Sequence, residues 1–214
     1  MASFHTTEDK TRYARMCRIL VDVTGNILRE ELLRHIQPAD IKMKIMQSFI
    51  HSVKSKKKTF KHVIDTAHND GYAKFDISLL YVLLRNLCPK LEQPTGGWDN
   101  RNKSTTSGEV RPISPISGKP FPCHNERTLG DDIERIHLTR NDLDHLGAAS
   151  LTKSEYSFYF DQMVNVCNRM DVRHLNGKRN YWNALKIIET CPMDDKSIQV
   201  YIEHIGLAKA VEGM

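Results

Sequence analysis

With 214 residues, 40% of them apolar, the chain is long enough for one large domain with a buried core, which excludes a protein disordered throughout. Its formal net charge of +5 arises from 31 basic and 26 acidic residues, so charge permits a nucleic-acid partner without requiring one. The sequence has no apolar signal region and no run of about 18 apolar residues, so we expect a soluble protein with no membrane partner.

Helical periodicity dominates the N-terminal part of the chain. Apolar residues recur at three- and four-residue steps from Thr7 to His35, and Pro38 ends this segment. A second helix is expected from Ala39 to about Val53, and the run KSKKK follows it. These lysines are typical of a solvated helix end, and the alternative is contact with phosphate. The candidate RNA contacts are Lys54, Lys56, Lys57 and Lys58.

A buried helix and a long irregular segment come next. Asp76 is expected to cap the apolar run ISLLYVLLRNLC, which Pro89 stops. Residues 92–128 are rich in Pro, Gly and Ser and show no period. Because such a segment has little apolar surface to offset its ordering entropy, we expect a flexible, removable loop that proteases cut first.

More helices are expected in the C-terminal half. One extends from Gly130 to about Leu146, and the next, from Thr152 to Met170, starts with Thr152 and Glu155 at capping-box spacing. Two further helical stretches are Tyr181 to Thr190 and Asp194 to Val211.

No segment shows the period-two alternation of a strand. The predicted fold class is therefore all-α, an up-and-down helical bundle with one long irregular insertion. We divide the chain into a bundle at residues 1–172 and a C-terminal helical extension at residues 173–214.

The spacing of the cysteines identifies neither a disulfide pattern nor a metal site. Their number is odd and no C-x-x-C pair occurs, which argues against both disulfides and a zinc cage. Cys123 and His124 are the only adjacent Cys/His pair. We therefore expect a reduced, cytoplasmic protein with no metal and no cofactor.

The segment RNDLDH gathers chemically active side chains near the end of one predicted helix. Residues four apart share a helix face, so Asn141 lies above His145 and Arg140 lies above Asp144. Histidine exchanges protons near neutral pH, and the planar fork of arginine suits phosphate oxygens. This pair fits cleavage of RNA by its own 2′-hydroxyl. The structural alternatives are a salt bridge between Arg140 and Asp144 or Asp142, and a His145 that caps carbonyls.

Arg140 also continues an apolar series along the helix. Leu129, Ile133 and Ile136 occupy one face, and the next step after Ile136 is Arg140. A charge at such a position requires a counter-charge, a water-filled cleft or a subunit interface.

The residues around this segment resemble a known family. R-N-D-L-D-H matches the R-polar-x3-H motif of HEPN domains. The ordered series from Phe75 to Met170 resembles the HEPN domain of DZIP3-type proteins; it consists of FDISLLYVLLRNLCP, a PTGGW loop, LGDDIERIHLTRN and LTKSEYSFYFDQMVNVCNRM.

The resemblance implies an all-α bundle that forms a homodimer. Many HEPN domains are metal-independent endoribonucleases in which Arg and His of two protomers meet in a shared cleft. By this resemblance Arg140 would hold and neutralise the scissile phosphate, His145 would transfer a proton, and Asn141 would position the phosphate or His145. Asp142 and Asp144 would weaken the binding of a polyanion.

Two other interpretations stay open at this stage. DZIP3-type domains occur in larger proteins that resemble ubiquitin ligases or innate-immunity proteins, where the resemblance implies a noncatalytic association module. A plain RNA-binding helical domain is the third interpretation, although the sequence has no stacking motif of aromatic and basic residues.

Overall fold

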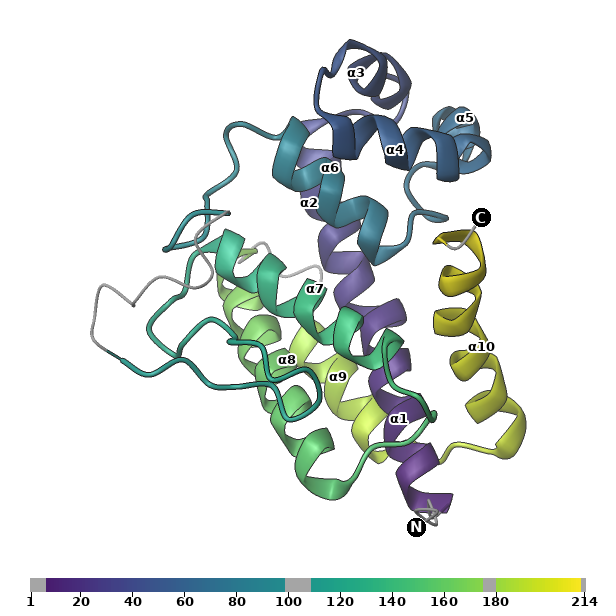
Figure 1. Cartoon of the computed structure of the whole chain (residues 1–214), viewed down its shortest axis with the longest axis vertical. Coiled ribbons are helices and arrows are strands. Elements are labelled where there is room, and N and C mark those ends of the chain that lie inside the picture. Colours follow the sequence, from purple (N-terminus) through teal and green to yellow (C-terminus); the bar gives the residue numbers. More distant parts are fainter. Residues whose placement is uncertain (1–6, 99–108, 175–179, 213–214) are drawn as a thin grey trace.

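The chain folds into a bundle of helices (Figure 1). The computed structural model describes residues 7–98, 109–174 and 180–212, and it describes only the backbone of Lys56 and of residues 204–212. Within these ranges the chain forms no strand, and Ile113 and Pro120 make one isolated antiparallel bridge. The predicted all-α fold class is thus confirmed for the described part of the chain.

The N-terminal helix is long and contains a π-helical segment. It consists of α1 (Thr7–Arg18), η1 (Ile19–Thr24) and α2 (Gly25–His35), and the backbone stays in the right-handed helical region at both junctions. The inner face of this helix supplies part of the core through Met16, Leu20, Ile27 and other fully buried side chains. The predicted helical stretch from Thr7 to His35 is confirmed, and the π-helical part of it was not predicted.

Three short helices lie at one end of the molecule (Figure 1). They are α3 (Ile41–Gln47), α4 (His51–Thr59) and α5 (Lys61–Asp70). The prediction of one helix from Ala39 to about Val53 is wrong, because the backbone becomes extended at Ser48 and ends α3 there. The lysines of KSKKK therefore lie inside α4 and not beyond the end of a helix.

The centre of the bundle is made by α6 (Ile77–Leu87), α7 (Leu129–Asp144) and α8 (Lys153–Arg173). α7 packs against α6 on one side and α8 on the other (Figure 1). The predicted caps are confirmed: Asp76 Oδ1 accepts from the Leu79 amide at 2.7 Å, and Thr152 forms its capping box with Glu155. These caps satisfy amide groups that the first helical turn leaves without partners.

The C-terminal helices pack onto the same bundle. α9 (Tyr181–Thr190) lies against α8, and α10 (Asp195–Glu212) lies against α1. The hydroxyl of Tyr181 donates to Glu30 at 2.6 Å. The division of the chain at residues 172 and 173 stays a prediction, but the described side chains of α9 share the core of the bundle.

Several described residues of the 92–128 segment are buried, in contrast to the flexible loop that its composition predicts. Phe121 and Cys123 are fully buried, and Arg135 Nη2 of α7 donates at 2.6 Å to the carbonyl oxygen of Cys123. The same Nη2 donates at 2.6 Å to the Glu126 carbonyl. Residues 99–108 lie outside the described part of the chain. A few buried groups thus hold the described part of this segment against α7, although its composition is mostly polar.

Gly130 shows how closely this segment approaches α7. A Cβ atom at this position would lie 2.2 Å from the Pro94 backbone nitrogen. The first turn of α7 therefore contacts the chain at residues 93–94 directly, which only glycine permits.

We expect Gly130→Ala to lower the free energy of unfolding by about 1–3 kcal/mol, because the added methyl group must displace packed backbone. Gly147→Ala is the matched control, since its Cβ would meet nothing within 4 Å. Urea unfolding of both variants measures the difference, and equal midpoints would contradict this close approach.

Phe121→Ala should lower the free energy of unfolding by about 3–5 kcal/mol, because it empties a fully buried site in the 92–128 segment. Val110→Ala in the same segment removes an 87% exposed side chain and should change little. Thermal unfolding distinguishes the two variants. A stable Phe121→Ala protein would restore the interpretation of a removable loop.

Candidate functional site

Arg140 lies inside the bundle near the C-terminal end of α7. Its side chain is 7% exposed, and its Nη1 atom lies 3.3 Å from Oδ2 of Asp144, whose side chain is 2% exposed. Nη1 is also 3.3 Å from the side-chain oxygen of Asn141. Asp144, one helical turn later, thus supplies the counter-charge that allows a guanidinium to occupy an apolar face.

Asn141 is held by a histidine other than the predicted one. Its Nδ2 atom lies 3.1 Å from Nε2 of His137, one turn earlier in α7. The His137 ring stacks on Tyr81 of α6, with ring centroids 3.6 Å apart and an angle of 4° between the rings. The i, i+4 spacing of His137 and Asn141 is visible in the sequence, but the stacking on α6 is not.

His145 occupies the end of the helix and is exposed. It is the C-cap residue of α7, and its backbone N–H donates to the Asn141 carbonyl at 3.1 Å. The predicted catalytic pair therefore consists of one buried cation and one imidazole in solvent. The structure brings Arg140 and Asn141 together and leaves His145 outside their buried contacts.

The face of α7 toward α6 carries further polar groups. Tyr81 donates its hydroxyl hydrogen to Glu134 Oε1 at 2.5 Å, and Arg85 Nη1 lies 3.3 Å from the same hydroxyl oxygen. Glu134, His137 and Asn141 follow one another along this face of the helix. A row of hydrogen-bonding side chains therefore joins α6 to α7, and the prediction from the sequence missed it.

The opposite side of α7 is equally engaged. Asp142 Oδ2 accepts from Ser114 Oγ at 2.6 Å and from the Tyr159 hydroxyl at 2.9 Å. Burial and the nearby Asp142 charge raise the pKa of Tyr159. Asp142 thus ties the 92–128 segment and α8 to α7.

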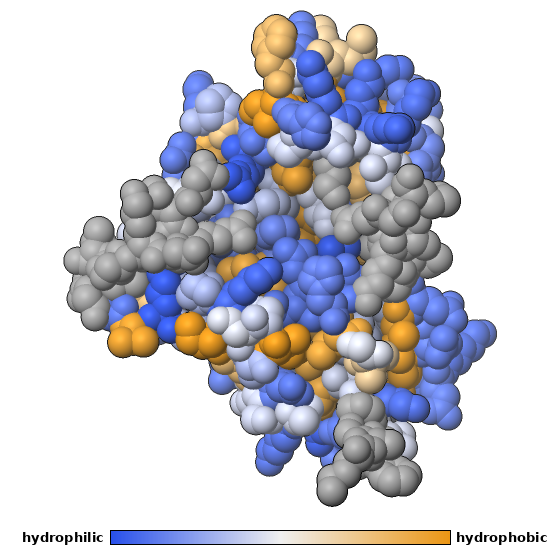
Figure 2. Space-filling model, in the orientation of Figure 1, coloured by the Kyte–Doolittle hydropathy of each residue, from blue (hydrophilic) through white to orange (hydrophobic). Residues whose placement is uncertain are grey.

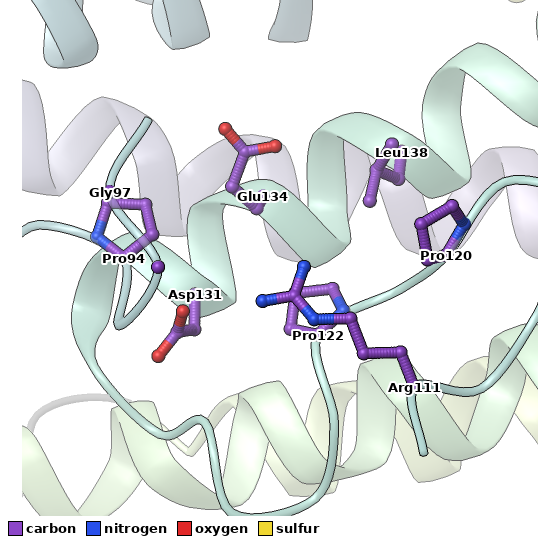
Figure 3. A pocket seen from close by; sticks show the side chains of 9 residues that line it. Pro94, Gly97, Arg111, Pro120, Pro122, Asp131, Glu134 and Leu138 are labelled. Carbon is purple, nitrogen blue, oxygen red and sulfur yellow. The ribbon is translucent and has the colours of Figure 1, made fainter. Parts of the chain in front are cut away.

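A narrow pocket lies beside the first half of α7 (Figure 3). Arg111 reaches toward the helix from the 92–128 segment, and Asp131 and Glu134 line the helix side. The cavity volume is about 20 Å³, which holds about one water molecule. Arg111 is paired with Glu126, and Asp131 accepts from Thr95, so the charged lining is already engaged. None of the predicted site residues lines this pocket.

The candidate RNA contacts belong to another part of the fold. Lys54 and Lys58 are exposed on α4 and Lys57 is half-buried, while the side chain of Lys56 lies outside the described atoms. Figure 1 places α4 in the upper part of the molecule and α7 in its middle. The structure therefore does not gather these lysines with Arg140.

The buried cysteines are poor candidates for a nucleophile. Burial raises the pKa of the Cys88 thiol to about 12, and burial raises the pKa of Cys17, Cys123 and Cys167 as well. A neutral buried thiol is inert, because the thiolate is the reactive form. In the described ranges no three His, Cys, Asp or Glu side chains are grouped to hold a metal ion.

Comparison with models of protein families shows the family to which this chain belongs. A model described as DZIP3/hRUL138-like HEPN matches residues 40–201, which include α7 and its R-N-D-L-D-H segment. The chain belongs to this HEPN family. Comparisons with curated proteins and with solved structures gave no match. Within the described residues of this HEPN domain, no helix has the length and apolarity to cross a membrane.

The contribution of the Arg140–Asp144 salt bridge to stability can be measured by substitution. Arg140→Ala should lower the free energy of unfolding by about 3–5 kcal/mol, because it leaves the Asp144 carboxylate buried without its cation. The double variant Arg140→Met/Asp144→Leu should be more stable than Arg140→Ala, since it removes both charges. His145→Ala is the control and should stay within about 0.5 kcal/mol of wild type. Urea unfolding compares the three, and a wild-type stability of Arg140→Ala would contradict the buried pair.

Proposed function

We propose that this HEPN domain is a noncatalytic association module. The observation that carries the proposal is the buried ion pair between Arg140 and Asp144. A scissile phosphate at Arg140 would lie beside the Asp144 carboxylate, which repels it. Asn141, the second polar residue of the motif, is bound to His137. Arg140 and Asn141 thus contact neighbouring side chains of α7 in place of a substrate.

A second copy of the chain is the partner that we propose. The position of Arg140 on the apolar face of α7 does not by itself require a dimer, because Asp144 neutralises Arg140 within one chain. Support for the dimer comes from the resemblance to HEPN domains, which often associate around a two-fold axis.

Metal-independent RNA cleavage is the second candidate function, and the exposure of His145 favours it. An imidazole in solvent at the motif position is accessible for proton transfer. In this mechanism Arg140 would leave Asp144 and stabilise the charge on the phosphorane. His145 would take the proton of the 2′-hydroxyl as the 2′-oxygen bonds to phosphorus. The bond to the 5′-oxygen then breaks and this oxygen takes up a proton, leaving a 2′,3′-cyclic phosphate.

An assay on single-stranded RNA separates the two functions. We expect wild-type protein to cleave no faster than His145→Ala, because the guanidinium is not available to the phosphate. Chelator and a DNA substrate serve as controls for contaminating nucleases. The association proposal fails if wild type cleaves RNA with cyclic phosphate ends and His145→Ala is slower by about a hundred- to ten-thousand-fold.

Asp144→Asn provides an independent comparison in the same assay. For a ribonuclease it should increase cleavage, because it removes the charge that holds Arg140 away from substrate. For an association module it should only lower the free energy of unfolding. Thermal unfolding is measured in parallel so that reduced stability is not mistaken for reduced activity.

Sedimentation tests the proposed homodimer. We expect a dimer at protein concentrations on the order of tens of micromolar, in the range of a weak specific interface. A monomer throughout this range would exclude self-association as the function, and the partner would then be another protein.

A further inference from the structure

α3 and the turn that follows it expose a group of apolar side chains. The exposed fractions are 50% for Met43, 61% for Met46, 93% for Phe49 and 40% for Ile50. We call these four residues the apolar tip. Figure 1 places α3 at one end of the long axis of the molecule, and Figure 2 shows hydrophobic atoms at that end. Large apolar side chains that project together from an end of a domain are typical of a contact surface.

Basic residues flank the apolar tip along the chain, without acidic residues between them. The stretch from Asp40 to Asp65 contains seven lysines and no acidic residue between these two aspartates. Asp65 is already paired with Lys42 at 2.9 Å and with Lys61 at 2.7 Å. The positive charge of the intervening stretch is therefore not neutralised by its own sequence.

The remaining lysines with described side chains are Lys44, Lys54, Lys57 and Lys58, which we call the basic collar. Lys54 joins the collar to the tip, because its Nζ atom lies 5.6 Å from the centroid of the Phe49 ring. Lys44 lies on α3 between two residues of the tip, while the other three lysines lie on α4. Apolar and cationic groups thus occupy the same end of the molecule.

We propose that the apolar tip and the basic collar bind the surface of an anionic membrane. The tip would enter the boundary between headgroups and acyl chains, while the lysine stems extend along it and keep their ammonium groups among the phosphates. A shallow apolar insertion and a polybasic patch are each weak anchors alone and effective together. This proposal goes beyond the association module. It revises the expectation of no membrane partner, which rested on the absence of a signal region and of a spanning segment.

Other anionic partners fit less of the surface. An RNA base could stack on Phe49 beside Lys54, but two methionines and an isoleucine offer no comparable flat ring. An acidic amphipathic helix of another protein docks into a groove, whereas α3 projects at the end of the molecule (Figure 1). A membrane surface uses both the four apolar side chains and the lysines.

The test is co-sedimentation of the full chain with vesicles of phosphatidylcholine and phosphatidylserine, with pure phosphatidylcholine vesicles as the comparison. We expect binding to the anionic vesicles that weakens at high salt and is nearly lost on the neutral ones. Met46→Gln and the pair Lys54→Glu/Lys58→Glu should each weaken binding by about tenfold or more. Phe49→Leu should keep most of the binding, because it retains an apolar side chain.

Matched controls come from other exposed positions. Val172→Gln changes an exposed apolar residue on α8, and Lys119→Glu reverses an exposed charge in the 92–128 segment. Neither should change vesicle binding, and all variants should unfold at the wild-type temperature because the altered side chains are exposed.

Three outcomes would overturn the proposal. One is the absence of binding to phosphatidylserine vesicles, and another is equal binding to both kinds of vesicle. The third is binding of single-stranded RNA that is lost in Phe49→Leu and unchanged in Met46→Gln. This result would assign the apolar tip to RNA. RNA cleavage and dimerisation are measured separately, so failure here leaves the proposed function to its own tests.

Discussion

The burial of charge along α7 is the constraint on which the bundle depends. This helix lies between α6 and α8, and its carboxylates and guanidinium groups have little access to water. Removing such groups from water is unfavourable unless partners are placed at hydrogen-bonding distance. Asp132 illustrates the solution, because it accepts at 3.0 Å from Arg135 of its own helix and at 3.0 Å from Arg169 of α8. Elements packed around α7 are therefore positioned by polar contacts as well as by apolar area.

The same constraint accounts for the character of the R-N-D-L-D-H segment. Residues that could perform chemistry in solvent act here as partners for one another, as the pairs Arg140–Asp144 and Asn141–His137 show. Both pairs lie within α7, and the stacking of His137 on Tyr81 connects this set of polar residues to α6.

Local signals in the sequence predicted the long N-terminal helix and the helices from α6 onward, but not the division into α3, α4 and α5. The contacts between helices could not be predicted. Asp76 before an apolar run, and Thr152 with Glu155, identify helix starts because the cap and the capped amide are neighbours in the chain. No proline or glycine occurs between Gln47 and His51 to indicate the break between α3 and α4. The burial of Phe121 and the stacking of His137 on Tyr81 join segments distant in sequence, so periodicity carries no information about them.

The π-helical segment at Ile19–Thr24 sets the two halves of the longest helix at different rotational angles. A π-helical turn holds one residue more than an α-helical turn, and one residue corresponds to about 100° of rotation around the axis. α1 packs against α7, α8, α9 and α10, while α2 packs against α6. Insertion or deletion of a single residue in this stretch would change the angle between the two faces without breaking the helix. The length of the π-helical segment therefore determines which helices can pack against α1 and which can pack against α2.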